Sequence, residues 1–158
     1  MLKAIIFDFD LTLFNSTLLK PYMDKREWSL VYKNIPHCSF YPYVIESIKR
    51  LRENNIKITI VSNSPSIYVS KVLKYYNIYI DYIVCYHDVI QHKPNPEGVY
   101  KVLNHLSLLK TDVVYIGDND IDFNTANNAQ IQFFGVPWGN FSQQVEKIDY
   151  NILGKIKE

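Results

Sequence analysis

The segment KAIIFDFDLT at residues 3–12 decides the fold, because an apolar run at 3–7 leads directly into two aspartates. A run that is almost continuously apolar, instead of alternating, is typical of a strand covered on both faces, as in a parallel sheet. Four further short runs, mostly of β-branched or aromatic residues, follow along the chain at 57–61, 82–85, 113–116 and 131–136. Together these runs predict five strands of one parallel sheet.

Amphipathic segments separate the runs and predict helices between the strands. Helical spacing of apolar residues begins after Pro42, after Ser64-Pro65 and after Pro96, and a fourth segment occupies 120–129. We expect Ser64 to be the N-cap of its helix and Pro65 to be the first helical residue. Strands that alternate with helices predict an α/β fold, a three-layer sandwich around a doubly wound parallel sheet.

Residues 15–41 interrupt this alternation, because they follow the first strand where a crossover helix is expected at once. Within them Trp28, Val31 and Tyr32 have the spacing of a short amphipathic helix that packs by this face. The segment is too short to be a domain. We therefore expect one domain over 1–158, with 15–41 as a short cap or lid insert.

Charge and composition give no support for several kinds of partner. The chain has 17 Lys and Arg against 16 Asp and Glu, so its net charge gives no support for binding to nucleic acid or to an anionic membrane. No apolar stretch approaches the roughly 18 residues that a membrane span needs, and the N-terminus lacks the pattern of a signal peptide. We expect a cytoplasmic protein. Its 2 cysteines are too few for a disulfide framework.

Polar side chains follow the predicted strands, and in an open α/β sheet ligands bind beyond the carboxyl ends of the strands. Two acidic clusters, a hydroxyl cluster and a lysine are therefore expected to converge at one edge of the sheet. In chain order they are Asp8 and Asp10, Ser62 and Asn63, Lys93, and Asp118 and Asp122.

Each of these groups, taken alone, also has a purely structural explanation. Carboxylates at strand ends often cap a following helix, Ser62 can belong to a turn, and Lys93 can be an ordinary surface lysine. Their order along the chain, with each group past a separate strand, favours one shared site over four coincidences.

At this point the chain resembles the haloacid dehalogenase superfamily over nearly its whole length. The last stretch of the resemblance is similar to the branch that contains phosphoglycolate phosphatases. The resemblance implies a strand order of 5-4-1-2-3, numbered along the chain, and a phosphatase that depends on Mg²⁺. The matching motifs are DFDLTLF at 8–14, TIVSN at 59–63, KPNPE at 93–97, YIGD at 115–118 with Asp122, and FGVPWG at 134–139.

The resemblance and the chemistry of phosphate esters imply a role for each acidic residue. A phosphate monoester is a dianion, so a carboxylate nucleophile must be shielded from it by a cation, and Mg²⁺ prefers oxygen ligands. Asp8 is expected to attack phosphorus and form an aspartyl-phosphate, and Asp10 to act as acid and base. Asp8 and Asp118 are the expected carboxylate ligands of Mg²⁺. The Asp10 carbonyl is a ligand implied by the family, and Asp122 acts on the metal indirectly or through water.

The remaining site residues are expected to bind the phosphate. Ser62, Asn63 and Lys93, with neighbouring backbone N–H groups, would hold the non-bridging oxygens and offset charge in the transition state. The presence of Asp10 argues against dehalogenase activity, because dehalogenases of the superfamily lack this second aspartate. The short insert argues against phosphomutase activity, because a phosphomutase needs a large cap to exclude water from the aspartyl-phosphate.

The chain departs from its resemblance at Leu11 and Gln130, where many relatives carry Gly, and in the size of its cap. Caps make most contacts that specify the substrate, so the substrate stays open: a small phosphorylated metabolite is preferred, a phosphoprotein is an alternative and a nucleic-acid end is disfavoured. A non-catalytic binding or regulatory module is a second hypothesis, disfavoured because the predicted catalytic residues are all present. Structural zinc is disfavoured because the cysteines and histidines are irregularly spaced.

Overall fold

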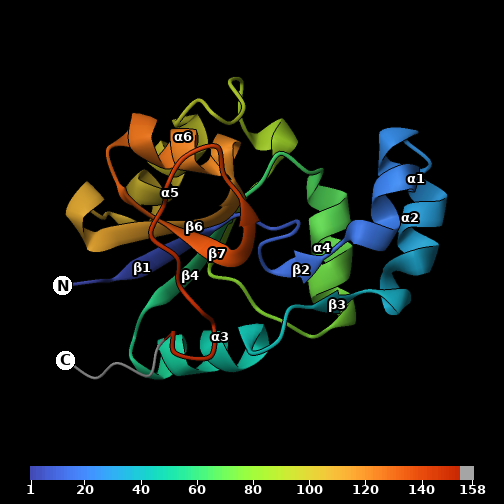
Figure 1. The fold of residues 1–158 in the computed structure, drawn as a ribbon, viewed down its shortest axis with the longest axis horizontal. Coiled ribbons are helices and arrows are strands. Elements are labelled where there is room, and N and C mark those ends of the chain that lie inside the picture. Colours follow the sequence, from blue (N-terminus) through green and yellow to red (C-terminus); the bar gives the residue numbers. More distant parts are fainter. Residues whose placement is uncertain (154–158) are drawn as a thin grey trace.

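The computed structural model describes residues 1–153, which form a five-stranded parallel sheet with helices on both faces (Figure 1). The strand order is β5-β4-β1-β6-β7. When these five strands are numbered 1 to 5 along the chain and read from the β7 edge, the order is 5-4-1-2-3, as the resemblance implies. In chain order the strands are β1 (Ala4–Phe7), β4 (Lys57–Val61), β5 (Tyr82–Val84), β6 (Val113–Asn119) and β7 (Gln132–Asn140). The predicted α/β fold is confirmed.

The central strand β1 divides the interior into two cores. Ile5 and Phe7 belong to one core and Ala4 and Ile6 to the other, as expected for side chains that alternate across a strand. All four are buried, which explains why the strand reads as continuously apolar. The first core contains α3 (Val44–Glu53) and α4 (Ser66–Tyr75), and the second contains α5 (Glu97–Leu106) and α6 (Asp120–Ala129).

Helix boundaries agree with the sequence except at the start of α4. The helix α6 spans the predicted residues, and the side chain of its N-cap, Asn119, accepts a hydrogen bond of 3.1 Å from the backbone N–H of Asp122. The prediction of Ser64 as the N-cap of α4 is wrong. Pro65 is the N-cap, with an extended ψ of 141°, and the Ser64 hydroxyl instead donates to Asp10.

A small antiparallel ribbon joins the two ends of the segment 15–41. Strand β2 (Phe14–Asn15) pairs with β3 (Ser39–Phe40), so the two ends of the predicted 15–41 segment lie side by side. Between them stand α1 (Lys20–Asp24), which was not predicted, and α2 (Trp28–Asn34), which was. Short 3₁₀ turns occupy Thr17–Leu19, Ile35–His37, Tyr86–Asp88 and Lys110–Asp112.

The predicted packing face of α2 is also observed. The ring of Trp28 lies 6.3 Å from that of Tyr32 and 6.4 Å from that of Tyr68 on α4, and Val31 is fully buried. In Figure 1, α1 and α2 stand beside α4 at one end of the molecule. Residues 15–41 therefore pack against α4 through aromatic contacts.

Two further predictions concern membranes and cysteines. Among residues 1–153, no helix combines the length and the apolar character that crossing a bilayer requires. Cys38 and Cys85 are both buried free thiols. Burial raises the pKa of Cys85 to about 12, with the nearby Asp88 carboxylate as a second cause, so this thiol is a packing residue and not a nucleophile.

Candidate active site

A cavity of about 410 Å³ opens at the carboxyl ends of the central strands. Its position is the one expected for a ligand site in an open α/β sheet. All of the residues predicted for the site line it: Asp8, Asp10, Ser62, Asn63, Lys93, Asp118 and Asp122. The structure thus brings these side chains together, while their chemical roles stay predictions.

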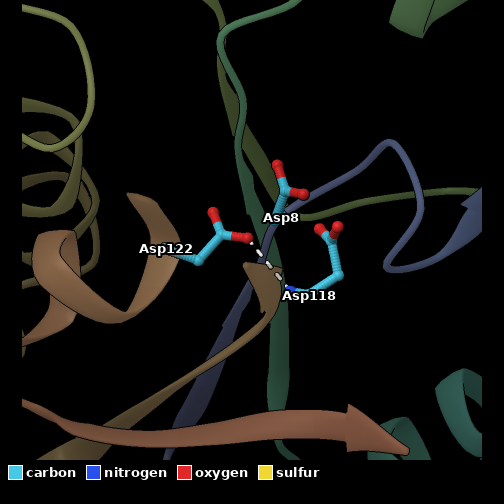
Figure 2. Close-up of side chains that lie close together, drawn as sticks. All are labelled: Asp8, Asp118 and Asp122. Carbon is cyan, nitrogen blue, oxygen red and sulfur yellow. Dashed lines mark hydrogen bonds between the residues drawn. The ribbon is translucent and has the colours of Figure 1, made fainter. Parts of the chain in front are cut away.

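Three carboxylates converge in the cavity (Figure 2). Asp8 follows β1, Asp118 lies near the end of β6, and Asp122 projects from the first turn of α6. Each offers an oxygen that lies within 4.8 Å of the other two. All three residues are buried, so their charges have little water around them.

Gly117 makes this convergence possible. A Cβ atom at Gly117 would lie 2.4 Å from the Cβ of Asp122, closer than carbon atoms can approach. The absence of a side chain lets α6 start directly against β6, where the backbone N–H of Asp118 donates to Asp122 at 3.0 Å. This contact fixes one Asp122 oxygen and turns the other toward the cavity.

Thr12 joins two of the carboxylates. Its hydroxyl oxygen lies 3.1 Å from Oδ2 of Asp8 and 2.9 Å from Oδ1 of Asp118, and its single hydrogen can be donated to only one of them at a time. Thr12 is fully buried. It stands inside the first motif, but sequence reasoning gave it no role because its second partner is far away in the chain.

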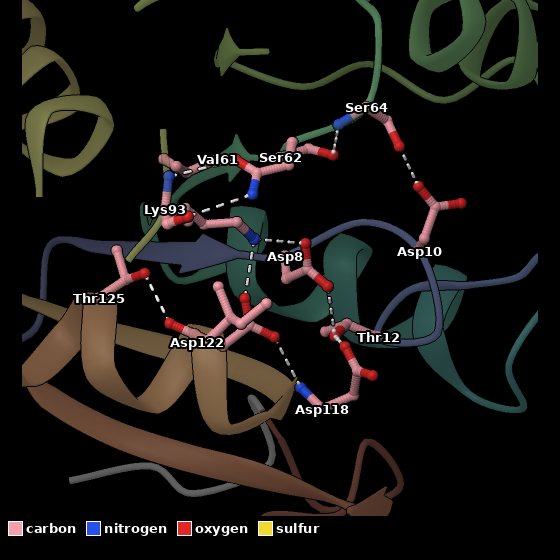
Figure 3. Close-up of polar contacts among 12 residues, drawn as sticks. Asp8, Asp10, Thr12, Val61, Ser62, Ser64, Lys93, Asp118, Asp122 and Thr125 are labelled. Atoms are coloured by element: carbon pink, nitrogen blue, oxygen red, sulfur yellow. Dashed lines mark hydrogen bonds and ion pairs between the residues drawn. The ribbon is translucent and has the colours of Figure 1, made fainter. Parts of the chain in front are cut away.

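Lys93 lies at the centre of the polar network (Figure 3). Its ammonium group donates to Asp8 and to Asp122, each at 2.8 Å, and to the hydroxyl of Tyr115 at 3.3 Å. Burial alone lowers the pKa of Lys93, but the carboxylates of Asp122 and Asp8 outweigh it and hold this pKa well above its usual value. The lysine is therefore a permanent cation.

Asn63 positions the loop that carries Lys93. The backbone N–H of Lys93 donates to Oδ1 of Asn63 at 3.2 Å, and Nδ2 of Asn63 donates to the Lys93 carbonyl at 3.4 Å. Sequence reasoning predicted Asn63 as a phosphate ligand. Its amide group is instead paired with the backbone, and a phosphate contact stays a prediction for this residue.

The Ser62 hydroxyl is free to donate its hydrogen to a group in the cavity. Its hydroxyl oxygen accepts a hydrogen bond of 3.0 Å from the backbone N–H of Ser64. Because a hydroxyl has one hydrogen and two acceptor positions, this contact leaves the hydrogen of Ser62 available for an anion. The residue is buried at the end of β4 and has one well-defined place.

Asp10 faces a different set of partners from Asp8. Its carboxylate accepts hydrogen bonds from the hydroxyls of Ser64, at 2.5 Å, and Tyr68, at 2.7 Å (Figure 3 shows the Ser64 contact). Burial, followed by the charge of Asp10, raises the pKa of Tyr68, which keeps its phenol protonated. Tyr68 is a further residue that sequence reasoning missed.

The turn after Asp10 is held by aromatic side chains. Leu11 has a φ of 60°, the left-handed conformation that Gly adopts without strain, which explains why Gly is expected there. The indole N–H of Trp138 donates to the Leu11 carbonyl at 2.8 Å, and the hydroxyl of Tyr150 donates to the Thr12 carbonyl at 3.0 Å. Trp138 also stacks on Tyr41 at 4.0 Å, so it packs against this turn.

Residues 20–136, which are more than half of the chain, match the family model described as haloacid dehalogenase-like hydrolase. The chain belongs to this family. It is 34% identical over 94 residues to pyrophosphatase PpaX of Halalkalibacterium halodurans, a match that covers 58% of the chain and 44% of the relative. It is 29% identical over 106 residues to the phosphoglycolate phosphatase of Pectobacterium atrosepticum, covering 65% of the chain and 45% of the relative. The chain thus spans less than half of each of these relatives.

Solved structures share the fold of this chain at low sequence identity. A predicted phosphoglycolate phosphatase from Haemophilus somnus superposes with a TM-score of 0.83 at 18% identity, covering 98% of this chain and 97% of that one. The protein CbbY from Rhodobacter sphaeroides, solved in complex with phosphate, gives a TM-score of 0.76 at 14% identity, covering 92% and 91%. These likenesses establish the fold. The curated phosphoglycolate phosphatase among the relatives agrees with the predicted resemblance to that branch.

The electrostatics of the cavity fit a divalent cation. Burial first, and then the nearby charge of Asp8, raise the pKa of Asp118 to about 9. The same two causes raise the pKa of Asp122, although Lys93 opposes them. These raised pKa values mean that Lys93 alone does not offset the cost of ionising the buried carboxylates, which a second cation would reduce. An all-oxygen set of this kind suits Mg²⁺, and it is the one group of potential metal ligands found within residues 1–153.

Proposed function

We propose that this chain is a phosphatase that depends on Mg²⁺ and hydrolyses a phosphate monoester through an aspartyl-phosphate on Asp8. The observation that carries the proposal is the position of the Asp8 carboxylate. It lies within 4.8 Å of two other carboxylates and 2.8 Å from the Lys93 ammonium group. A nucleophilic anion must be shielded from the phosphate dianion by positive charge. The Lys93 ammonium group supplies one such charge, and the neighbouring carboxylates would hold a second as a metal ion.

The metal would be held by the side chains of Asp8 and Asp118, with the Asp10 carbonyl as a further ligand and Asp122 acting indirectly or through water. When bound, Mg²⁺ neutralises charge on the phosphate and on these carboxylates. The fit rests on the oxygen-only donor set and on the raised pKa of Asp118.

The residues of the chain perform two successive displacements. In the first, an oxygen of Asp8 forms a bond to phosphorus, the bond to the leaving oxygen breaks, and Asp10 gives that oxygen a proton. In the second, a water oxygen attacks phosphorus, Asp10 takes a proton from the water, and Asp8 is released. Ser62 and Lys93 hold the non-bridging oxygens throughout, since both lie in the same cavity.

Two groups of residues form the walls of the cavity. We call Asp8, Lys93, Asp118 and Asp122 the sheet wall, and Thr17, Lys20, Met23 and Asp24 the insert wall. Because the insert wall belongs to 15–41, we propose that this segment acts as a short lid and contacts the part of the substrate beyond its phosphate. The rest of the chain would form one catalytic domain.

A small phosphorylated metabolite is the substrate class that the cavity supports best. Its volume of about 410 Å³ lies in the range of small-molecule sites. Relatives named as phosphoglycolate phosphatase and pyrophosphatase support small substrates, and the second name adds a phosphoanhydride as a candidate. A phosphoprotein remains the alternative, with a protruding phosphorylated side chain in place of the metabolite.

The test uses 4-nitrophenyl phosphate with Mg²⁺, and then with a chelator in excess. We expect turnover that the chelator abolishes and that Asp8→Asn lowers by about four orders of magnitude, since it removes the nucleophile. Asp149→Asn, which changes an exposed carboxylate, is the matched control and retains activity. Phosphoglycolate, pyrophosphate and a phosphopeptide, compared by kcat/KM, separate the substrate classes.

Absence of chelator-sensitive turnover on all of these substrates would favour the second hypothesis, a non-catalytic module that keeps the fold. Turnover that persists in Asp8→Asn would show that another residue is the nucleophile.

A further inference from the structure

Both carboxylate oxygens of Asp10 are held by hydroxyl groups from the start of one helix. The Ser64 hydroxyl lies 2.5 Å from Oδ2, and the phenolic oxygen of Tyr68 lies 2.7 Å from Oδ1. Ser64 stands just before α4, and Tyr68 lies in its first turn. The mechanism proposed above gives Tyr68 no part, although its hydroxyl contacts the acid and base directly.

Tyr68 is fixed by both parts of the molecule that border the cavity. Its ring packs edge-on against Phe9 at 5.9 Å, next to the nucleophile, and lies 6.4 Å from Trp28 in the insert. Tyr68 is 0% exposed, so its phenol has a single position.

The two donors differ in how they can handle a proton. Ser64 lines the cavity, and its hydroxyl can rotate to donate or to accept. Tyr68 reaches Asp10 from the interior, and its one hydrogen is directed at Oδ1. The proton that Asp10 exchanges with substrate and water therefore belongs on Oδ2, on the cavity side.

We propose that Tyr68 is a positioning residue for proton transfer, which holds Oδ1 of Asp10 so that Oδ2 presents the exchangeable proton to the leaving oxygen. This inference rests on the proposed function. In the first displacement the proton passes from Oδ2 to the leaving oxygen as the bond of that oxygen to phosphorus breaks. In the second, Oδ2 takes a proton from the attacking water as the oxygen of that water bonds to phosphorus.

The test compares Tyr68→Phe with the unmodified chain on a series of substituted phenyl phosphates. The variant keeps the ring and removes the donor. We expect kcat/KM, which reports the first displacement, to fall by about tenfold for the most basic leaving group, part of the 10² to 10⁴ that proton transfer contributes, and to change little for 4-nitrophenol. KM stays nearly constant, because the phosphate ligands are untouched.

The matched control is Tyr76→Phe. Its hydroxyl donates to the Cys38 carbonyl at the other end of the same helix, so its removal is an equal chemical change away from Asp10. We expect this variant to show the same dependence on leaving group as the unmodified chain. Thermal unfolding of both variants verifies that they are folded.

A second measurement separates positioning from a general effect on structure. In an Asp10→Asn background, Tyr68→Phe should cause no further loss of kcat, because the two residues act through one proton transfer. An equal loss of kcat in both backgrounds would overturn the proposal. So would a loss of kcat/KM that is the same for every leaving group, or a kcat/KM that Tyr68→Phe leaves unchanged on every substrate.

Ser64→Ala extends the test should Tyr68→Phe fold poorly, since it removes the donor to the other oxygen of Asp10. It is expected to produce the same steeper dependence on leaving group, and a uniform loss or no loss would count against the proposal. If the unmodified chain shows no turnover that depends on Mg²⁺, the proposed function itself fails. If it turns over and these variants keep its dependence on leaving group, only the role of Tyr68 fails.

Discussion

The two walls of the cavity differ in how firmly their side chains are held. In the sheet wall, Lys93 and Asp122 expose 6% and 1% of their side chains, and every charged group contacts an opposite charge or a hydrogen-bond partner. In the insert wall, Lys20 and Asp24 pair with each other at 2.9 Å with 67% and 61% of their side chains exposed. Rigid, buried groups suit the chemical step that members of a family share. Exposed side chains on a short insert can be substituted without disturbing that step.

Removal of Lys93 should have the largest effect. Lys93→Met leaves Asp8 and Asp122 without their shared cation. We expect kcat on 4-nitrophenyl phosphate to fall by about 100-fold or more and the metal-free protein to lose about 3 kcal/mol of stability. Urea unfolding in chelator measures the second quantity. Lys101→Met, at a lysine whose side chain is 43% exposed, is the control. Equal stability of Lys93→Met and the unmodified chain would contradict the description of the sheet wall as interdependent.

Asp118→Asn should have an effect of intermediate size on stability. The variant should be more stable than the unmodified chain without metal and less stabilised than it by Mg²⁺. Because burial and Asp8 raise the pKa of Asp118 to about 9, the folded protein binds this proton more tightly than the unfolded chain does. The metal-free protein therefore loses stability as pH rises from about 4 to 9. We expect the stability of the Asn variant to fall less over this pH range. Near neutral pH the variant should be about 2 kcal/mol more stable than the unmodified chain.

The same variant should no longer gain thermal stability from Mg²⁺, because it lacks a ligand. Thermal melts at several pH values, with chelator and with Mg²⁺, measure both effects. A variant that keeps the full stabilisation by Mg²⁺ would place the metal elsewhere.

Lys20→Ala should have the smallest effect and should change only the choice of substrate. An exposed pair on a helix contributes about 0.3–0.5 kcal/mol, so the melting temperature should hardly move. We expect KM to rise by a few fold for phosphate esters that carry a second anionic group, and to stay constant for 4-nitrophenyl phosphate. Asp24→Asn is the matched variant of opposite charge and should lower the same KM. A loss of kcat on all esters in Lys20→Ala would contradict the separation of the two walls.

The residues predicted for the site lie together in the structure because each group follows a strand of the sheet. A strand is recognised from its own apolar residues, and the carboxyl ends of parallel strands share one edge. Asp8 and Asp118 could therefore be placed together although they are far apart in the chain. The strand order, which only the resemblance implied, also agrees with the structure.

Residues that act through contacts with distant segments were missed. Thr12 reaches Asp118, Tyr68 reaches Asp10, and Tyr115 reaches Lys93, and in each case the partner lies in another element. Their local sequence suggests only helix or strand packing. The start of α4 was misassigned for a related reason, since Ser64 donates to Asp10 instead of capping the helix.

The sequence by itself determined the layered fold, the edge of the sheet at which the site lies and the residues that converge there. These follow from periodicity and from chain order, which are local properties. Only the tertiary structure decided which hydroxyl holds which carboxylate, and that the insert borders the cavity. Those outcomes depend on distances between separate elements, and side-chain packing fixes such distances only when the whole chain has folded.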